Sequence, residues 1–257
     1  MPIALLTDFG TKDHFVGAMK GVILGIDPNA AIVDITHEVG PQDIRSAAFL
    51  LLCCYTDFPS GTIFVVVVDP GVGSERRAIA VAAGANYFVG PDNGVFSFVL
   101  EREGKFEARE LTKKIYRRPS VSTTFHGRDI FAPAAAHISK GVSIEMFGPK
   151  ATDLIAMPGI SPDRDVAGAI RGEIVHIDRF GNLITNLKRE DLANPFRLEV
   201  RGRTIERIFS HFAEGPEIEP FLVEGSSAFV EIAIRDGSAA AFLGAKTGDQ
   251  VVLHLDI

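Results

Sequence analysis

Hydrophobic and polar positions follow two different patterns along the chain. In the first half, short apolar runs at 3–7 and 31–35 alternate with longer stretches at 13–26 and 43–55, where apolar residues recur every three or four positions. The short runs indicate buried strands and the wider spacing indicates helices. The order strand, helix, strand, helix, strand predicts an N-terminal α/β domain with a doubly wound, mostly parallel sheet.

A third apolar run, VVVV at 65–68, leads into the sequence DPGVGSERR. Consecutive β-branched residues are typical of a strand buried on both faces. Asp69 follows at the carboxyl end of that strand, where open α/β sheets bind their ligands. Gly71 and Gly73 then allow close approach of the backbone, and Arg76 adds a guanidinium nearby. The stretch is either a ligand-binding loop or a strand end followed by a surface ion pair.

The pattern changes after residue 156. Two prolines and several charges without periodicity predict a linker over 157–168. Beyond it, short alternating runs separated by glycine and polar turns predict a smaller, mostly antiparallel β-barrel-like domain. We therefore expect an N-terminal α/β domain at 1–156 and a C-terminal domain at 169–257. Its expected strands are 170–177, 196–200, 221–223, 229–234 and 251–255.

Composition and charge exclude several classes of partner. The 257 residues contain 26 Lys and Arg against 33 Asp and Glu, a net charge of −7, with no basic tract. This balance disfavours nucleic acid and anionic membrane surfaces as partners. No apolar run reaches the length of a membrane span, and the first residues lack the charged region of a signal peptide. Adjacent Cys53 and Cys54 are expected to be free thiols, which indicates a reducing, cytoplasmic location.

Two candidate sites fall in the first domain. Asp8 follows the first strand and could accept hydrogen bonds from a ribose diol, while Asp13 is expected to cap the next helix. His126 precedes an expected helix at 129–139, and an imidazole there suits activation or orientation of water. A purely structural histidine is the alternative. Neither GxGxxG nor GxxxxGK[ST] occurs, so a phosphate-binding loop is not supported.

A metal site receives little support from the sequence. The seven histidines show no HxxxH or HxH spacing. A site could only be assembled from acids and a histidine that are distant in sequence, namely Asp8, His37, Asp69 and Asp92. We expect no metal ion, and a metal-dependent phosphohydrolase is kept as an alternative class.

Two candidate sites fall in the second domain. In HIDRFGNLITN, the Asn182 amide could read an adenine edge while Phe180 stacks on the base. The alternative is a plain hairpin turn between two strands. In EGSSAFVEIAI, Ser226 precedes an alternating strand that contains Glu231, a residue that would ordinarily face solvent there.

Six motifs occur in the order typical of one family: TDFGTKDHFVGAMKG, VVDPGVGSERR, VGPDNG, FHGRDIFAP, DRFGNLITN and GSSAFVEIAI. Through nearly its whole length the chain resembles the S-adenosyl-L-methionine hydroxide adenosyltransferases, relatives of fluorinase and chlorinase. The resemblance implies hydrolysis of S-adenosyl-L-methionine to adenosine and L-methionine, with no cofactor. It also implies an α/β domain, a β-barrel-like domain, and a homotrimer with active sites at subunit interfaces.

The resemblance also implies roles for individual residues. Asp69, Arg76 and His126 would form the catalytic triad, and which of Asp69 and His126 acts as the base stays open, because their proton transfers would be coupled. The implied substrate contacts are Asp8 with the ribose hydroxyls, Asp178 with the methionine amino group, Phe180 and Asn182 with adenine, Ser226 with the methionine carboxylate, and Glu231 and Ile234 in the same ligand segment.

The chain departs from the halide-using relatives at two positions. Fluorinases carry a serine where this chain has Gly127 and a tyrosine where it has His126, together with a long insertion in the first domain. Chlorinases can have glycine at the first position, so Gly127 alone does not exclude chloride. The alternatives are therefore a chlorinase-like adenosyltransferase and a non-catalytic protein that binds S-adenosyl-L-methionine or adenosine.

Overall fold

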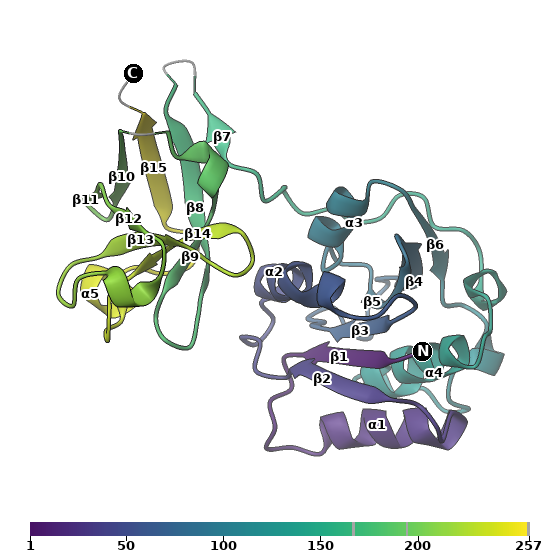
Figure 1. The fold of residues 1–257 in the computed structure, drawn as a ribbon. Coiled ribbons are helices and arrows are strands. Elements are labelled where there is room, and N and C mark those ends of the chain that lie inside the picture. The colour runs from purple at the N-terminus through teal and green to yellow at the C-terminus, as the bar shows by residue number, and fades with distance from the viewer. Residues whose placement is uncertain (166–167, 194, 256–257) are drawn as a thin grey trace. The chain divides into compact units, whose positions relative to one another are not determined.

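The structure is a computed structural model that describes residues 1–165, 168–193 and 195–255 (Figure 1). The chain divides into two compact units, Met1–Gly159 and Ile160–Ile257. Of the linker predicted at 157–168, residues 166–167 lie outside the described residues. Each unit is described by itself.

The first unit is built on a six-stranded sheet with the order β2-β1-β3-β5-β4-β6. Strands β2, β1, β3 and β5 are parallel, whereas β4 and β6 run antiparallel to their neighbours. The prediction of a mostly parallel sheet is therefore confirmed. The strand bounds are β1 (Ile3–Thr7), β2 (Ile32–Thr36), β3 (Ile63–Val67), β4 (Ala78–Ala83), β5 (Asn86–Pro91) and β6 (Phe106–Glu110).

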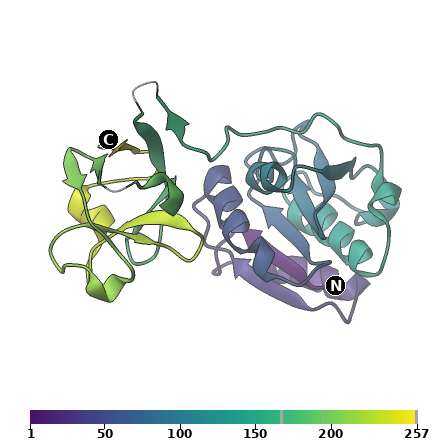
Figure 2. The ribbon, with the colours of Figure 1, turned by 45° about the horizontal axis from the view of Figure 1, so that its top comes forward.

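Helices cover both faces of this sheet. Helices α1 (Phe15–Ile26) and α4 (Ala132–Ser139) share a core cluster with Ile63, Val65 and Val67 of β3. Helices α2 (Ile44–Cys54) and α3 (Ser97–Glu103) lie together on the opposite face (Figure 1), and Figure 2 shows the same layers from a second direction. Every residue of β3 is at most 2% exposed. This double burial explains why the strand reads as an uninterrupted apolar run.

Three local predictions need correction. Helix α1 begins one residue later than a cap at Asp13 requires, and its N-cap is His14 with no side-chain hydrogen bond. The helix predicted at 129–139 begins as a π-helical turn at Gly127–Phe131. No strand is predicted at 106–110, but the structure forms the edge strand β6 there, with Ala108 buried. That strand escapes the sequence pattern because charged residues surround its single buried position.

The second unit is a curled, half-barrel sheet, as predicted. In the part that the structure describes, nine strands pair in the order β11-β10-β15-β8-β9-β14-β13-β12, with β7 added beside β8. A separate core cluster fills it, lined by Leu183, Leu198 and Val251. The strand bounds are β7 (Asp163–Arg164), β8 (Ile170–Ile177), β9 (Leu183–Lys188), β10 (Phe196–Val200), β11 (Arg203–Ile205), β12 (Ile208–Phe209), β13 (Phe221–Glu224), β14 (Phe229–Ala233) and β15 (Gln250–Leu255), and the helix is α5 (Ala239–Leu243).

Within the described ranges, no helix combines the length and the apolar character needed to cross a membrane.

A substitution at Gly90 of β5 would test the packing beneath the candidate site. A Cβ added there would meet the Val66 carbonyl oxygen and lie 2.9 Å from the Phe96 ring. We expect Gly90→Ala to lower the free energy of unfolding by about 1–3 kcal/mol through overpacking. Gly25→Ala in α1 is the matched control, because nothing lies within 4 Å of its added Cβ, and it should raise stability by about 0.5–1 kcal/mol. Urea unfolding measures both, and equal shifts would contradict the packing argument.

Candidate active site

A pocket of about 380 Å³ opens at the carboxyl ends of β1 and β3. Its walls come from segments that are far apart in sequence: the residues after β1, the loop after β3, and the segment before the π-helical turn. Parallel strands bring their carboxyl ends to one edge of the sheet, which is where open α/β folds hold ligands. The lining residues are Asp8, Phe9, Phe15, Gln42, Val67, Asp69, Pro70, Val72, Thr124, Phe125, His126 and Gly127.

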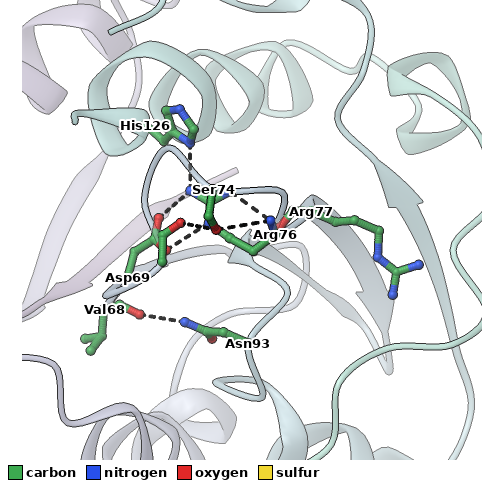
Figure 3. A network of polar contacts seen from close by, with 8 residues as sticks. Val68, Asp69, Ser74, Arg76, Arg77, Asn93 and His126 are labelled. Carbon is green, nitrogen blue, oxygen red and sulfur yellow. Dashed lines mark hydrogen bonds and ion pairs between the residues drawn. The ribbon is translucent and has the colours of Figure 1, made fainter. Parts of the chain in front are cut away.

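Arg76 joins Asp69 and His126 at this pocket (Figure 3). Its Nε donates to Asp69 Oδ1 at 2.8 Å, and a terminal guanidinium nitrogen donates to Asp69 Oδ2. The same nitrogen lies 2.7 Å from His126 Nδ1. The side chains of Arg76 and Asp69 are only 9% and 5% exposed. A buried, two-pronged guanidinium–carboxylate pair of this kind holds a fixed geometry.

The contact with Arg76 assigns the protonation state of His126. A guanidinium only donates hydrogen bonds, so His126 Nδ1 accepts and the ring proton sits on Nε2. Burial lowers the pKa of His126, and the charge of Arg76 lowers it further against the opposing charge of Asp69. The imidazole is therefore neutral at pH 7 and presents an Nε2–H donor. Nδ1 is already engaged.

The loop between Asp69 and Arg76 is stiffened by its own hydrogen bonds. Val72 N donates to the Asp69 carbonyl at 3.1 Å. The Ser74 hydroxyl donates to the Gly71 carbonyl at 2.7 Å and accepts from Arg76 N at 3.3 Å (Figure 3). Gly73 has a φ of 81°, and the Thr123 backbone leaves no room for a Cβ there. Gly73 of this motif is thus explained by turn geometry.

Asp8 and Gln42 meet on another wall of the pocket. Gln42 N donates to Asp8 Oδ2 at 2.9 Å. Gln42 has a φ of 66°, a left-handed conformation that few non-glycine residues adopt and that often marks functional sites. The sequence analysis missed Gln42, because a polar residue just before a helix cap reads as an ordinary turn.

Three aromatic rings form an apolar wall that the sequence analysis also missed. Phe9, Phe15 and Phe125 pack against one another with ring centroids 5.3–5.8 Å apart. Phe9 and Phe15 lie in the same sequence motif as Asp8, and Phe125 directly precedes His126. Their position beside these polar candidates was the signal from which an aromatic wall could have been predicted. The pocket therefore pairs one apolar wall with polar groups, as small-molecule sites do.

The four residues considered as metal ligands have separate partners. His37 Nδ1 lies 2.9 Å from the Thr7 hydroxyl, and its Nε2 lies 3.1 Å from Asp34 Oδ1. Asp92 pairs with Arg77 at 2.6 Å. Among the described residues, no group of three or more His, Cys, Asp or Glu side chains is arranged to hold a metal ion.

The remaining candidate residues lie in the second unit, and three of them share the hairpin between β8 and β9. Asp178 Oδ1 accepts from the backbone N–H groups of Phe180 and Asn182 at 2.9 and 2.8 Å. Asp178 Oδ2 accepts from the Asn182 side-chain amide at 2.8 Å. Phe180 is 76% exposed at the tip, so its ring is accessible. The hairpin reading was correct, and the same turn arranges all three candidate side chains.

The other three candidates belong to β14 and its ends. Glu231 is half-buried rather than simply solvent-facing, and burial together with the charge of Asp178 raises its pKa. Ser226 is exposed before the strand, whereas Ile234 is 7% exposed just after it. The structure thus brings Glu231 within electrostatic reach of the hairpin.

Comparison with known proteins covers both units. Residues 3–148 match the model of the SAM hydroxide adenosyltransferase N-terminal domain, and residues 172–252 match that of the C-terminal domain. Over 261 residues, the chain is 38% identical to a Thermus thermophilus protein named (R)-S-adenosyl-L-methionine hydrolase, covering 98% of this chain and 99% of the relative. A fluorinase of an Actinoplanes species is 31% identical over 218 residues, covering 74% and 72% of the two chains.

A solved structure is similar to nearly the whole chain. The crystal structure of an uncharacterized conserved protein from Thermotoga maritima superposes with a TM-score of 0.92 at 36% sequence identity. The match covers 98% of this chain and 100% of that one.

Replacement of Arg76 should raise the pKa of His126. In the unaltered protein we expect the imidazole to titrate below its ordinary value of 6.5, because burial and Arg76 both disfavour its charged form. In Arg76→Met that pKa should rise, since the largest positive charge acting on the ring is then removed while Asp69 remains. NMR titration of the ring nitrogens measures both values. His137, whose pKa is lowered by burial and Lys140, is the internal control and should not move. An unchanged His126 would disprove the assigned contact.

Proposed function

The chain belongs to the SAM hydroxide adenosyltransferase family, and on that premise we propose that it hydrolyses S-adenosyl-L-methionine to adenosine and L-methionine. The observation that carries the proposal is the contact of a guanidinium, a carboxylate and a neutral imidazole beside a pocket of nucleoside-accommodating size. Such a constellation suits the binding of a small oxygen nucleophile.

The leaving group of this reaction needs little assistance from the protein. The substrate sulfur is a sulfonium, so it departs as a neutral thioether with the electron pair of the C5′–S bond, and no general acid is required. A water-derived oxygen forms the new bond at the ribose C5′ from the opposite side. In-line placement alone can supply roughly 7–11 kcal/mol of the barrier. We also propose that no cofactor takes part, because neither electrons nor a carrier group need be exchanged.

The triad then acts on the attacking oxygen. His126 lines the pocket and donates through Nε2–H, and Arg76, donating to Nδ1, strengthens that donor by its positive charge. Asp69 holds the guanidinium through both of its oxygens. The two carboxylate oxygens of Asp69 and His126 Nδ1 already accept hydrogen bonds from Arg76. We therefore assign the triad to holding a hydroxide-like oxygen. The proton of that oxygen is left to solvent.

The substrate contacts are proposed from the same premise. Asp8 would accept from the ribose hydroxyls in the pocket of the first unit. In the second unit, Phe180 would stack on adenine and Asn182 would read its edge. The other proposed contacts in that unit are Asp178, Ser226, Glu231 and Ile234. We further propose a cytoplasmic location, supported by the reduced state of Cys53 and Cys54. We also propose a homotrimer with active sites at subunit interfaces, supported by the exposed ring of Phe180.

The surroundings of Gly127 disfavour the serine that fluorinases carry at this position. A Cβ added at Gly127 would lie 3.2 Å from Met19 Sδ and 3.4 Å from the Phe125 ring. The position where fluorinases carry serine is therefore closely packed. A serine there would force Met19 or Phe125 to move by a few tenths of an ångström.

One assay tests the proposed function. With S-adenosyl-L-methionine in ¹⁸O-water, we expect adenosine labelled at its 5′ oxygen and an equal amount of methionine, separated by chromatography with mass detection. Arg76→Met should lower kcat roughly 100-fold or more, with substrate Kd little changed, because it weakens an interaction made mainly in the transition state.

Other outcomes of that assay assign other functions. Tight binding without adenosine release identifies a binding protein, 5′-chloroadenosine in high chloride identifies a halide-using enzyme, and loss of activity with a chelator identifies a metal enzyme. Each would overturn the proposed hydrolysis.

Asp8→Ala should weaken adenosine binding about 10- to 100-fold, because two charge-assisted hydrogen bonds to the ribose are lost. Calorimetry with adenosine and 2′,3′-dideoxyadenosine makes the test specific. The unaltered protein should prefer adenosine strongly, whereas the variant should bind the two ligands alike. Asp13→Ala, which removes an exposed carboxylate from the same segment, is the control and should leave both affinities unchanged. A variant that keeps the preference would contradict the ribose role.

A further inference from the structure

One short turn forms hydrogen bonds to both ends of the loop that carries Asp69 and Arg76. The turn, at 92–94, directly follows β5. At the beginning of the loop, the Asn93 side-chain amide donates to the Val68 carbonyl at 2.9 Å (Figure 3). At its end, Asp92 N donates to the Arg77 carbonyl at 2.9 Å. The Asp92 carboxylate also accepts from Arg77 Nε and a terminal nitrogen at 2.9 and 2.6 Å.

Both side chains of the turn are fully engaged. The Asn93 oxygen accepts from Val95 N at 3.2 Å, which leaves its NH₂ group directed at Val68. Asp92 is 3% exposed, and its second oxygen accepts from Ile155 N at 2.9 Å. Arg77 in turn donates to Asp153 at 2.7 Å. A turn tied down at this many points can act as a rigid support.

The Val68 and Arg77 carbonyls that accept these hydrogen bonds lie next to triad residues in the chain. The Val68 carbonyl belongs to the peptide unit that leads into Asp69, and a planar peptide transmits the orientation of its oxygen to the next Cα. A rotation of that unit would carry the Asp69 carboxylate away from Arg76. Arg76, which bridges to His126, would then lose the two-pronged pair that orients it.

We propose that Asn93 is a positioning residue of the reaction, which sets the Asp69–Arg76–His126 geometry through the Val68 carbonyl. Asn93 is not among the residues that line the pocket, so it acts through Asp69 and not on the substrate. The kinetic part of this inference rests on the proposed hydrolysis, whereas the geometric part does not.

Asn93→Asp isolates the proposed hydrogen bond. Aspartate has the same shape and keeps an oxygen for Val95 N, but it has no donor for the Val68 carbonyl. The matched control is Asn86→Asp at the other end of β5. Asn86 is also half-buried and uses its oxygen to accept from Thr62 N at 3.1 Å, so the aspartate keeps that contact.

We expect Asn93→Asp to lower kcat for adenosine release roughly 10- to 100-fold with KM within about threefold, as for a small misplacement of catalytic groups. Asn86→Asp should retain the kcat of the unaltered protein. Thermal unfolding of both variants accompanies the kinetics. A kcat within twofold of the unaltered protein, or an equal loss in Asn86→Asp, would overturn the proposal.

A second measurement does not depend on turnover. The charged groups that act on His126 are Arg76, Asp69, Arg117 and Asp129. Of these, Asp69 and Arg76 lie on the loop whose ends are hydrogen-bonded by the turn. NMR of the His126 ring nitrogens should therefore show a changed Nδ1 signal and a raised pKa in Asn93→Asp, and neither in Asn86→Asp. An unchanged spectrum would overturn the positioning role.

The two measurements separate the possible failures. If the unaltered protein releases no adenosine, the proposed function fails, and the His126 spectrum alone still decides the positioning role. If Asn93→Asp does not fold, Asn93→Ala removes the donor without placing a carboxylate against the Val68 carbonyl. The same shift of the His126 signal is expected there, and its absence would refute the inference.

Discussion

The buried pair between Arg76 and Asp69 is the interaction on which the rest of the site depends. Removing two charges from water costs several kcal/mol each, and a buried pair repays this only with close geometry and further hydrogen bonds. The guanidinium meets that condition by contacting both carboxylate oxygens and His126 Nδ1. Together with burial of the ring, its charge lowers the pKa of His126 and keeps the imidazole neutral. A single ion pair thus defines the shape of the loop and the donor that the pocket receives.

The sheet provides the rigidity that such a pair needs. Strand β3 is buried on both faces, so Asp69 follows a segment that cannot shift without opening two cores. The neighbouring strand β5 lies parallel to β3 and ends at the same edge, which brings Asn93 against Val68. Parallel topology therefore supplies both the loop that carries Asp69 and Arg76 and its support at one edge. The aromatic wall of Phe9, Phe15 and Phe125 closes the pocket on its apolar side.

The second unit uses a different structural solution for its polar groups. Here a hairpin folds Asp178 back onto its own turn, so that one carboxylate organises the backbone of Phe180 and the amide of Asn182. Burial, together with this nearby charge, raises the pKa of Glu231 on the adjacent strand β14. The hairpin tip is thus ordered by its own hydrogen bonds, whereas the pocket of the first unit is ordered by the edge of a sheet.

Local patterns in the sequence were enough to determine the main elements, because strand and helix periodicities are properties of neighbouring residues. The strand before Asp69, the hairpin at Phe180 and the family motifs around Arg76 and His126 could all be read in this way. Strand β6, the tautomer of His126, and the roles of Gln42 and Asn93 could not. Each of these depends on a partner 23 or more residues away, such as Val68 for Asn93 and Asp8 for Gln42. Only the folded sheet brings such partners within hydrogen-bonding distance.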